Sequence, residues 1–109
     1  MAGKFELKTA KDGQYMFNLK AGNGQVILTS ELYKTKAAAE NGIESVKNNA
    51  DNAARYDAKA SDSGKFYFNL KAGNGQIIGT SPMFADAAAR DAAIAETQKV
   101  AKEAATESA

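Results

Sequence analysis

The chain has 109 residues and a mass of 11.5 kDa, which is the size of one ordinary domain. It contains no histidine and no cysteine, so Ser/His/Asp and Cys/His nucleophilic systems, thiol redox chemistry and imidazole metal sites are excluded. Fourteen basic and thirteen acidic residues give a formal net charge of +1, without the strong basic excess that favours binding to nucleic acid or an anionic membrane.

The first part of the chain predicts a three-stranded meander. Apolar and polar residues alternate from Lys4 to Thr9 and from Tyr15 to Lys20, as in strands with one buried face. Asp12-Gly13, between them, favours a hairpin turn because glycine readily adopts a positive φ. Gly22-Asn23-Gly24 predicts a second turn, which is followed by a strand from about Gln25 to Ser30.

The hydrophobic period then changes to that of a helix. Thr35 is the predicted N-cap of a helix that ends near Asn48. Asp86 is the corresponding N-cap of a longer, alanine-rich helix from Ala87 to Ala105. The apolar face of the first helix consists of Ala39, Ile43 and Val46.

The two halves of the chain are copies of one unit. With a shift of 51 residues, positions 4–46 align with positions 55–97 without a gap and with 17 identities in 43 pairs. Residues 17–25 recur letter for letter as residues 68–76. A unit of this size does not bury its hydrophobic face alone, so we expect the two copies to pack against each other.

These elements predict an α+β fold. Two tandem β-β-β-α repeats share one antiparallel sheet, and two helices pack on one face of it with pseudo-two-fold symmetry. The chain is then a single domain over residues 1–109, with repeat 1 at 4–50 and repeat 2 at 55–105.

The repeated residues also resemble a known family. Its features are the strand Phe17-Asn18-Leu19-Lys20-Ala21, the Asn-Gly turn, the strand end Thr29-Ser30, Tyr33 and the helical stretch from Asn41 to Lys47. Duplicated at about 50 residues, this pattern resembles the tandem form of the YegP-like family of small bacterial proteins. The resemblance spans nearly the whole chain and is weakest in the second helix. It implies two β(3)-α-β units that share one sheet and exchange C-terminal strands, and it brings no known activity.

One departure from that family concerns the C-terminus. A strand after the second helix would fall near Thr106, where the chain offers four short, mostly polar residues that follow good helix formers. We therefore predict that the last strand is missing or vestigial, that the second helix is longer than the first, and that one sheet edge lacks a strand.

Polar residues that are identical in the two copies are the candidate binding residues. A symmetric binding face on the open side of the sheet would explain their identity, and so would ordinary strand and turn chemistry after a recent duplication. Both interpretations stay open at this point. The residues are Asn18, Lys20, Asn23, Gln25 and Thr29 in repeat 1 and Asn69, Lys71, Asn74, Gln76 and Thr80 in repeat 2.

The function that these residues favour is a non-catalytic interaction module, which binds another protein or a small polar ligand through the exposed sheet face and the hairpins. The alternative is weak binding of single-stranded nucleic acid through sheet aromatics and lysines, with Tyr67 on the open face. The Gly-Asn-Gly turns lack the Gly-Lys-Ser/Thr end of a phosphate-binding loop and the third glycine of a dinucleotide site. We therefore expect no cofactor, no metal site, no catalytic residues and no enzymatic activity.

Localisation and assembly follow from the same composition. No apolar run reaches the length of a membrane span or of a secretory signal, so we expect a cytoplasmic protein with no membrane partner. The resemblance to the YegP-like family implies that it is bacterial. We expect a monomer, and the alternative is a dimer that forms through an exposed sheet edge.

Overall fold

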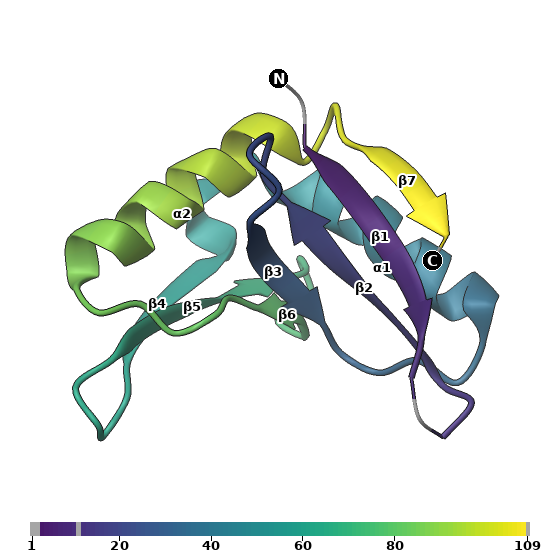
Figure 1. Cartoon of the computed structure of the whole chain (residues 1–109), viewed down its shortest axis with the longest axis horizontal. Coiled ribbons are helices and arrows are strands. Elements are labelled where there is room, and N and C mark those ends of the chain that lie inside the picture. The colour runs from purple at the N-terminus through teal and green to yellow at the C-terminus, as the bar shows by residue number, and fades with distance from the viewer. Residues whose placement is uncertain (1–2, 11, 109) are drawn as a thin grey trace.

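The computed structural model describes residues 3–10 and 12–108 of the chain (Figure 1). Repeat 1 contributes three strands and a helix, and repeat 2 contributes the same set followed by one more strand. The elements are β1 (Lys4–Thr9), β2 (Tyr15–Lys20), β3 (Val26–Ser30), α1 (Lys36–Asn49), the short 3-10 helix η1 (Ala53–Arg55), β4 (Tyr56–Ala60), β5 (Phe66–Lys71), β6 (Ile77–Thr80), α2 (Ala87–Val100) and β7 (Ala105–Ser108).

All seven strands belong to one sheet, in the order β4-β5-β6-β3-β2-β1-β7. The two repeats join where β3 pairs with β6, and Thr29 lies opposite Thr80 in that antiparallel pair. The α+β class and the shared sheet are confirmed. The prediction of a purely antiparallel sheet is wrong, because β7 runs parallel to β1.

Strand β7 also corrects the expectation for the C-terminus. Helices α1 and α2 both have 14 residues, so the second is not longer, and the last strand is present. Ala101 and Ala104 are buried after α2 and hold the chain against the core, which brings residues 105–108 to the free edge of β1. Pairing at that edge outweighs the helix preference of the local sequence. Within the described residues, the edge without a further strand is that of β4.

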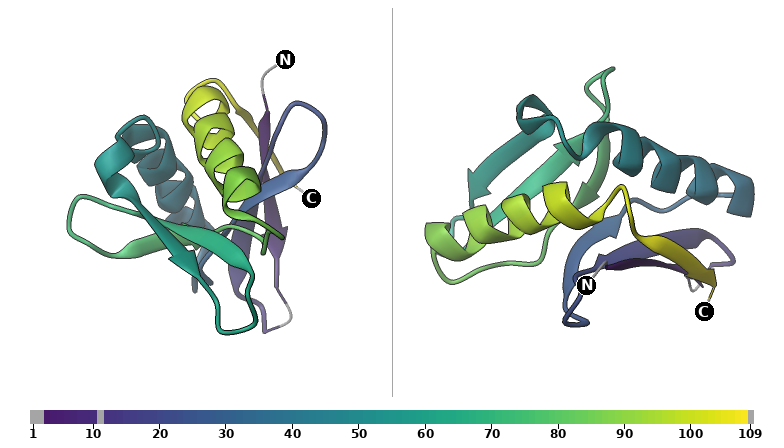
Figure 2. Two further views of the ribbon diagram at one scale, coloured as in Figure 1. Left: turned by 90° about the vertical axis from the view of Figure 1, so that its left-hand side faces the viewer. Right: turned by 90° about the horizontal axis from the view of Figure 1, so that it is seen from above.

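Both helices lie on the same side of the bent sheet (Figure 2). The predicted N-caps are confirmed, because Thr35 Oγ1 accepts a hydrogen bond from the amide of Ala38 and Asp86 Oδ1 accepts one from the amide of Ala89. The core between helices and sheet is continuous across the two repeats, so neither repeat has a core of its own. Its fully buried large apolar side chains are Phe5, Phe17, Phe68, Leu19, Leu28, Leu70 and Val46.

The predicted Asn-Gly turns are present in both repeats. Gly24 and Gly75 have φ angles of 86° and 87°, which a side chain would make unfavourable. In each turn the preceding asparagine stabilises the chain, since Asn23 Oδ1 accepts from the amide of Gln25 at 3.0 Å and Asn74 does the same for Gln76. These two turns project from the sheet toward the helix of the other repeat.

Candidate functional site

The sheet face opposite the helices carries a continuous row of polar side chains, one from each strand. Strand register places these residues directly opposite one another from one edge of the sheet to the other. We call this set the polar row. It consists of Asp57, Asn69, Thr80, Thr29, Asn18, Glu6 and Glu107, in spatial order.

Two identical hydrogen-bonded pairs form the centre of the polar row. Thr29 Oγ1 donates to Asn18 Oδ1 at 3.0 Å, and Thr80 Oγ1 donates to Asn69 Oδ1 at 2.8 Å. Among the described residues, neither asparagine amide nitrogen has a hydrogen-bond partner, and neither is sealed from solvent. Both asparagines are largely buried, at 8% and 6% exposed, so their carboxamide N–H donors are open only to a ligand that lies close against the sheet.

A charged cluster flanks each end of this central part. Glu6 forms ion pairs with Lys8 at 3.1 Å and Lys20 at 3.2 Å. Asp57 lies 3.3 Å from both Lys59 and Lys71. Hydrogen bonds from these lysines hold the pKa of both carboxyl groups below the ordinary values. One carboxylate and two ammonium groups give each cluster a net charge of +1.

The structure divides the predicted site residues between two places. Six of them, namely Asn18, Lys20 and Thr29 with their repeat-2 copies Asn69, Lys71 and Thr80, lie on the open face. The other four, Asn23, Gln25, Asn74 and Gln76, lie in the turns and border grooves on the helix side. The ten residues therefore do not share one face, because the turns bend away from the sheet surface, and their role in binding stays a prediction.

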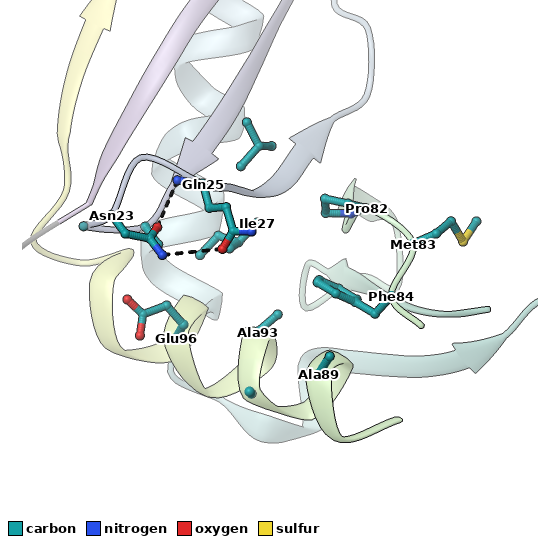
Figure 3. A pocket seen from close by; sticks show the side chains of 13 residues that line it. Asn23, Gln25, Ile27, Pro82, Met83, Phe84, Ala89, Ala93 and Glu96 are labelled. Atoms are coloured by element: carbon teal, nitrogen blue, oxygen red, sulfur yellow. Dashed lines mark hydrogen bonds between the residues drawn. The ribbon is translucent and has the colours of Figure 1, made fainter. Parts of the chain in front are cut away.

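Each groove lies between the turn of one repeat and the helix of the other. The α2 groove, of about 930 Å³, is lined among others by Asn23, Gln25, Phe84, Ala92, Ala93 and Glu96 (Figure 3). The α1 groove, of about 690 Å³, is lined by the equivalent residues Asn74, Gln76, Tyr33, Asn41, Gly42 and Ser45. In the α1 groove, burial and the charge of Glu31 raise the pKa of Tyr33.

Sequence reasoning did not identify the helix-side walls of these grooves. It gave weight to positions that are identical in the two repeats, whereas the groove walls include positions that differ, such as Ser45 and its counterpart Glu96. Comparison of the unequal positions of the repeat is the sequence signal that would have found them.

The sheet aromatics are mostly unavailable for stacking with bases. Phe5, Phe17 and Phe68 are fully buried beneath the helices, and Tyr56 packs against the same core. Of the aromatic residues on the described strands, Tyr67 alone belongs to the open face. Sheets that recognise single-stranded nucleic acid usually stack two or three bases on aromatic rings, so this geometry gives the nucleic-acid alternative little support.

These features define a small α+β protein built from two pseudo-symmetric repeats. Within the described residues, no group of three His, Cys, Asp or Glu side chains could hold a metal ion. No described helix combines the length and the apolar character needed to cross a membrane. The chain matches the family described as "Domain of unknown function (DUF1508)" twice, over residues 10–57 and 61–107, and it belongs to that family.

Similar proteins agree with this assignment. The UPF0339 protein YegP of Escherichia coli K12 is 55% identical over 98 residues, which cover 90% of this chain and 89% of YegP. A UPF0339 protein of Pseudomonas aeruginosa is 49% identical over 104 residues, covering 95% of this chain and 94% of its own.

Solved structures show the same fold. The solution NMR structure of the E. coli protein of unknown function YegP has a TM-score of 0.93 at 50% identity, covering 99% of this chain and 93% of that one. The solution NMR structure of a UPF0339 protein from Shewanella oneidensis also has a TM-score of 0.93. It is 49% identical and covers 99% of this chain and 92% of that one. The resemblance to the YegP-like family is confirmed. These relatives are uncharacterised, and nothing in them points to a catalytic activity.

Proposed function

We propose that the chain is a non-catalytic binding module that holds an extended acidic segment of a partner protein across the polar row. One observation carries this proposal: two identical Asn–Thr pairs meet at the junction of the repeats, between two clusters that each have a net charge of +1. The carboxamide donors suit carbonyl and carboxylate oxygens, and the clusters attract negative charge from both sides.

The spacing of the row suits an extended chain. Three inter-strand steps separate Asn18 from Asn69, which amounts to roughly 14 Å at about 4.8 Å per step. An extended peptide rises about 3.3 Å per residue, so about four residues cover this distance. A peptide that crosses the strands therefore reaches both asparagines at once, whereas a small polar ligand would contact only one.

The test is an NMR titration of the isotope-labelled chain with a hexamer of glutamate. We expect the amide signals of Asn18, Thr29, Asn69 and Thr80 to shift together, with an affinity that falls as salt rises. A hexamer of lysine serves as the charge-reversed control. Oligodeoxythymidylate tests the nucleic-acid alternative, which would show shifts centred on Tyr67 instead.

Variants of the row complete the test. Asn18→Ala combined with Asn69→Ala removes both carboxamides, and we expect it to abolish the shifts while the spectrum stays dispersed. Asn48→Ala, at an exposed position of α1, is the matched control and should leave binding unchanged. Shifts confined to the helices, or equal binding by both variants, would refute the proposed function.

We also propose that the chain is monomeric and that it is located in the cytoplasm. Sedimentation of the purified chain and fractionation of cells that produce it test these two points. A stable dimer, or a protein recovered outside the cytoplasm, would contradict them.

A further inference from the structure

The two grooves are equivalent in position but have diverged in chemistry. Four equivalent wall positions differ between the grooves. At three of them the α2 groove has an apolar residue where the α1 groove has a polar one, and at the fourth it has a carboxylate where the α1 groove has a serine. Each groove thus carries one carboxylate, Glu31 in the α1 groove and Glu96 in the α2 groove, and the α2 groove has fewer other polar side chains. The exchanges, from repeat 1 to repeat 2, are Glu31 to Pro82, Tyr33 to Phe84, Asn41 to Ala92 and Ser45 to Glu96.

The charge and the apolar surface lie at opposite ends of the α2 groove. Figure 3 shows Glu96 beneath the turn that carries Asn23, whereas Pro82 and Met83 lie at the far end. The helix between these ends presents small side chains, among them Ala89 and Ala93. Glu96 and Ala89 are seven residues apart on α2, which corresponds to a rise of about 10.5 Å.

The surroundings leave the carboxylate available to a ligand. Glu96 is half-buried, and within the described part of the chain it forms no ion pair, including with Lys99 one turn further along α2. No lysine or arginine of the described residues lines the groove. At the other end Met83 is 56% exposed, and a flexible thioether adapts well to apolar ligands.

We propose that the α2 groove binds a small organic ammonium ion with an apolar body, whose ammonium group contacts Glu96 and whose body lies along Ala92 and Ala93 toward Phe84. The α1 groove discriminates against the same ligand. Its carboxylate, Glu31, lies at the position equivalent to Pro82, Ser45 occupies the position of Glu96, and Asn41 and the Tyr33 hydroxyl interrupt its apolar wall. The site is separate from the polar row, so either proposal can fail without the other.

Hexylammonium is the probe, and amide shifts of the isotope-labelled chain are the readout. We expect shifts at Asn23, Gln25, Ala92, Ala93 and Glu96 and none at the equivalent residues of the α1 groove. Hexanoate keeps the alkyl chain and reverses the charge, and ethylammonium keeps the charge without the chain. Both should bind at least about fivefold more weakly, because hexanoate exchanges attraction to Glu96 for repulsion and ethylammonium lacks most of the methylene groups that the groove would bury.

Two variants locate the contacts. Glu96→Gln keeps the shape of the side chain and should weaken hexylammonium about fivefold, while its effect on hexanoate is small. Ala92→Asn installs the residue of the α1 groove at an exposed position and should weaken binding through the apolar body. Glu40→Gln, on the exposed face of α1, is the control and should change nothing. Equal shifts in both grooves, equal binding of hexanoate, or full binding by Glu96→Gln would overturn the proposal.

Discussion

Leu28 and Gly79 occupy equivalent positions in the two repeats, and the side chain of Leu28 fills the space that a side chain at Gly79 would need. A Cβ atom on Gly79 would lie 3.0 Å from Cγ of Leu28 and 2.9 Å from the carbonyl oxygen of Thr29. Leu28 itself is fully buried beside the junction of β3 and β6. The junction of the repeats is therefore asymmetric in packing although its strands are related by pseudo-symmetry.

This packing predicts that Gly79→Ala lowers the free energy of unfolding by about 1–3 kcal/mol, because the methyl group must displace backbone or a core leucine. Urea unfolding followed by circular dichroism measures the change. Gly73→Ala is the control, since its Cβ would meet only the Arg55 guanidinium at 3.4 Å. A loss at Gly79 no larger than that at Gly73 would contradict this account of the junction.

A second pair of positions has changed together between the repeats. The Tyr33 ring stacks on Phe17, and a Cβ on Gly42 would lie 2.5 Å from the Tyr33 hydroxyl oxygen, 2.8 Å from Cζ of the same ring and 3.0 Å from Cε2 of Phe17. Repeat 2 has Phe84 and Ala93 at the equivalent positions, so the hydroxyl is absent where the methyl group is present.

We expect Gly42→Ala to destabilise the wild-type chain by about 1–3 kcal/mol, and to cost less when Tyr33→Phe has removed the hydroxyl group. A double-mutant cycle in urea gives the coupling, which should be about 0.5 kcal/mol or more. Additive effects of the two substitutions would show that the hydroxyl does not require the glycine.

Buried serines connect the strands in both repeats. Ser30 Oγ accepts a hydrogen bond from the Phe17 amide at 2.9 Å, and Ser81 Oγ accepts one from the Phe68 amide at 3.0 Å. Ser30→Ala leaves a buried amide without its partner, so we expect a loss of about 1–3 kcal/mol of stability. Urea unfolding measures this loss. Ser63→Ala, in an exposed turn, should lower the free energy of unfolding much less.

The ion pairs of the open face predict a pH dependence. Hydrogen bonds from Lys8 and Lys20 lower the pKa of Glu6, and the contribution of Lys8 is the larger. The folded pKa is below the ordinary value of 4.5 for a glutamate in the unfolded chain, so the stabilisation is present above that pH. It is lost as the pH falls through the folded value.

NMR titration of the side-chain carboxyl measures this shift. Lys8→Ala should raise the pKa of Glu6 toward its ordinary value, because it removes the larger of the two hydrogen bonds. Lys36→Ala, at the exposed start of α1, should leave it unchanged. An unaltered midpoint in Lys8→Ala would show that the ion pair does not persist in solution.

Local chemistry accounts for the parts of the fold that sequence analysis predicted correctly. The alternation in β1 and β2, the Asn-Gly turn before Gln25 and the N-caps Thr35 and Asp86 each depend on a few neighbouring residues. The same holds for the repeat, which is visible by comparison of the chain with itself. Strand β7 was missed because its residues favour a helix locally.

Local sequence patterns thus specify the strands of each meander, the turns, the helix starts and the identity of the polar residues in both repeats. Residues 105–108 form a strand only in the folded chain, because their partner β1 lies about a hundred positions earlier in the sequence. The tertiary structure also brings Asn18 and Thr29 together with Asn69 and Thr80 in one row, since strand register across the β3–β6 junction is a long-range property. The grooves have the same origin, because each requires a turn from one repeat and a helix from the other.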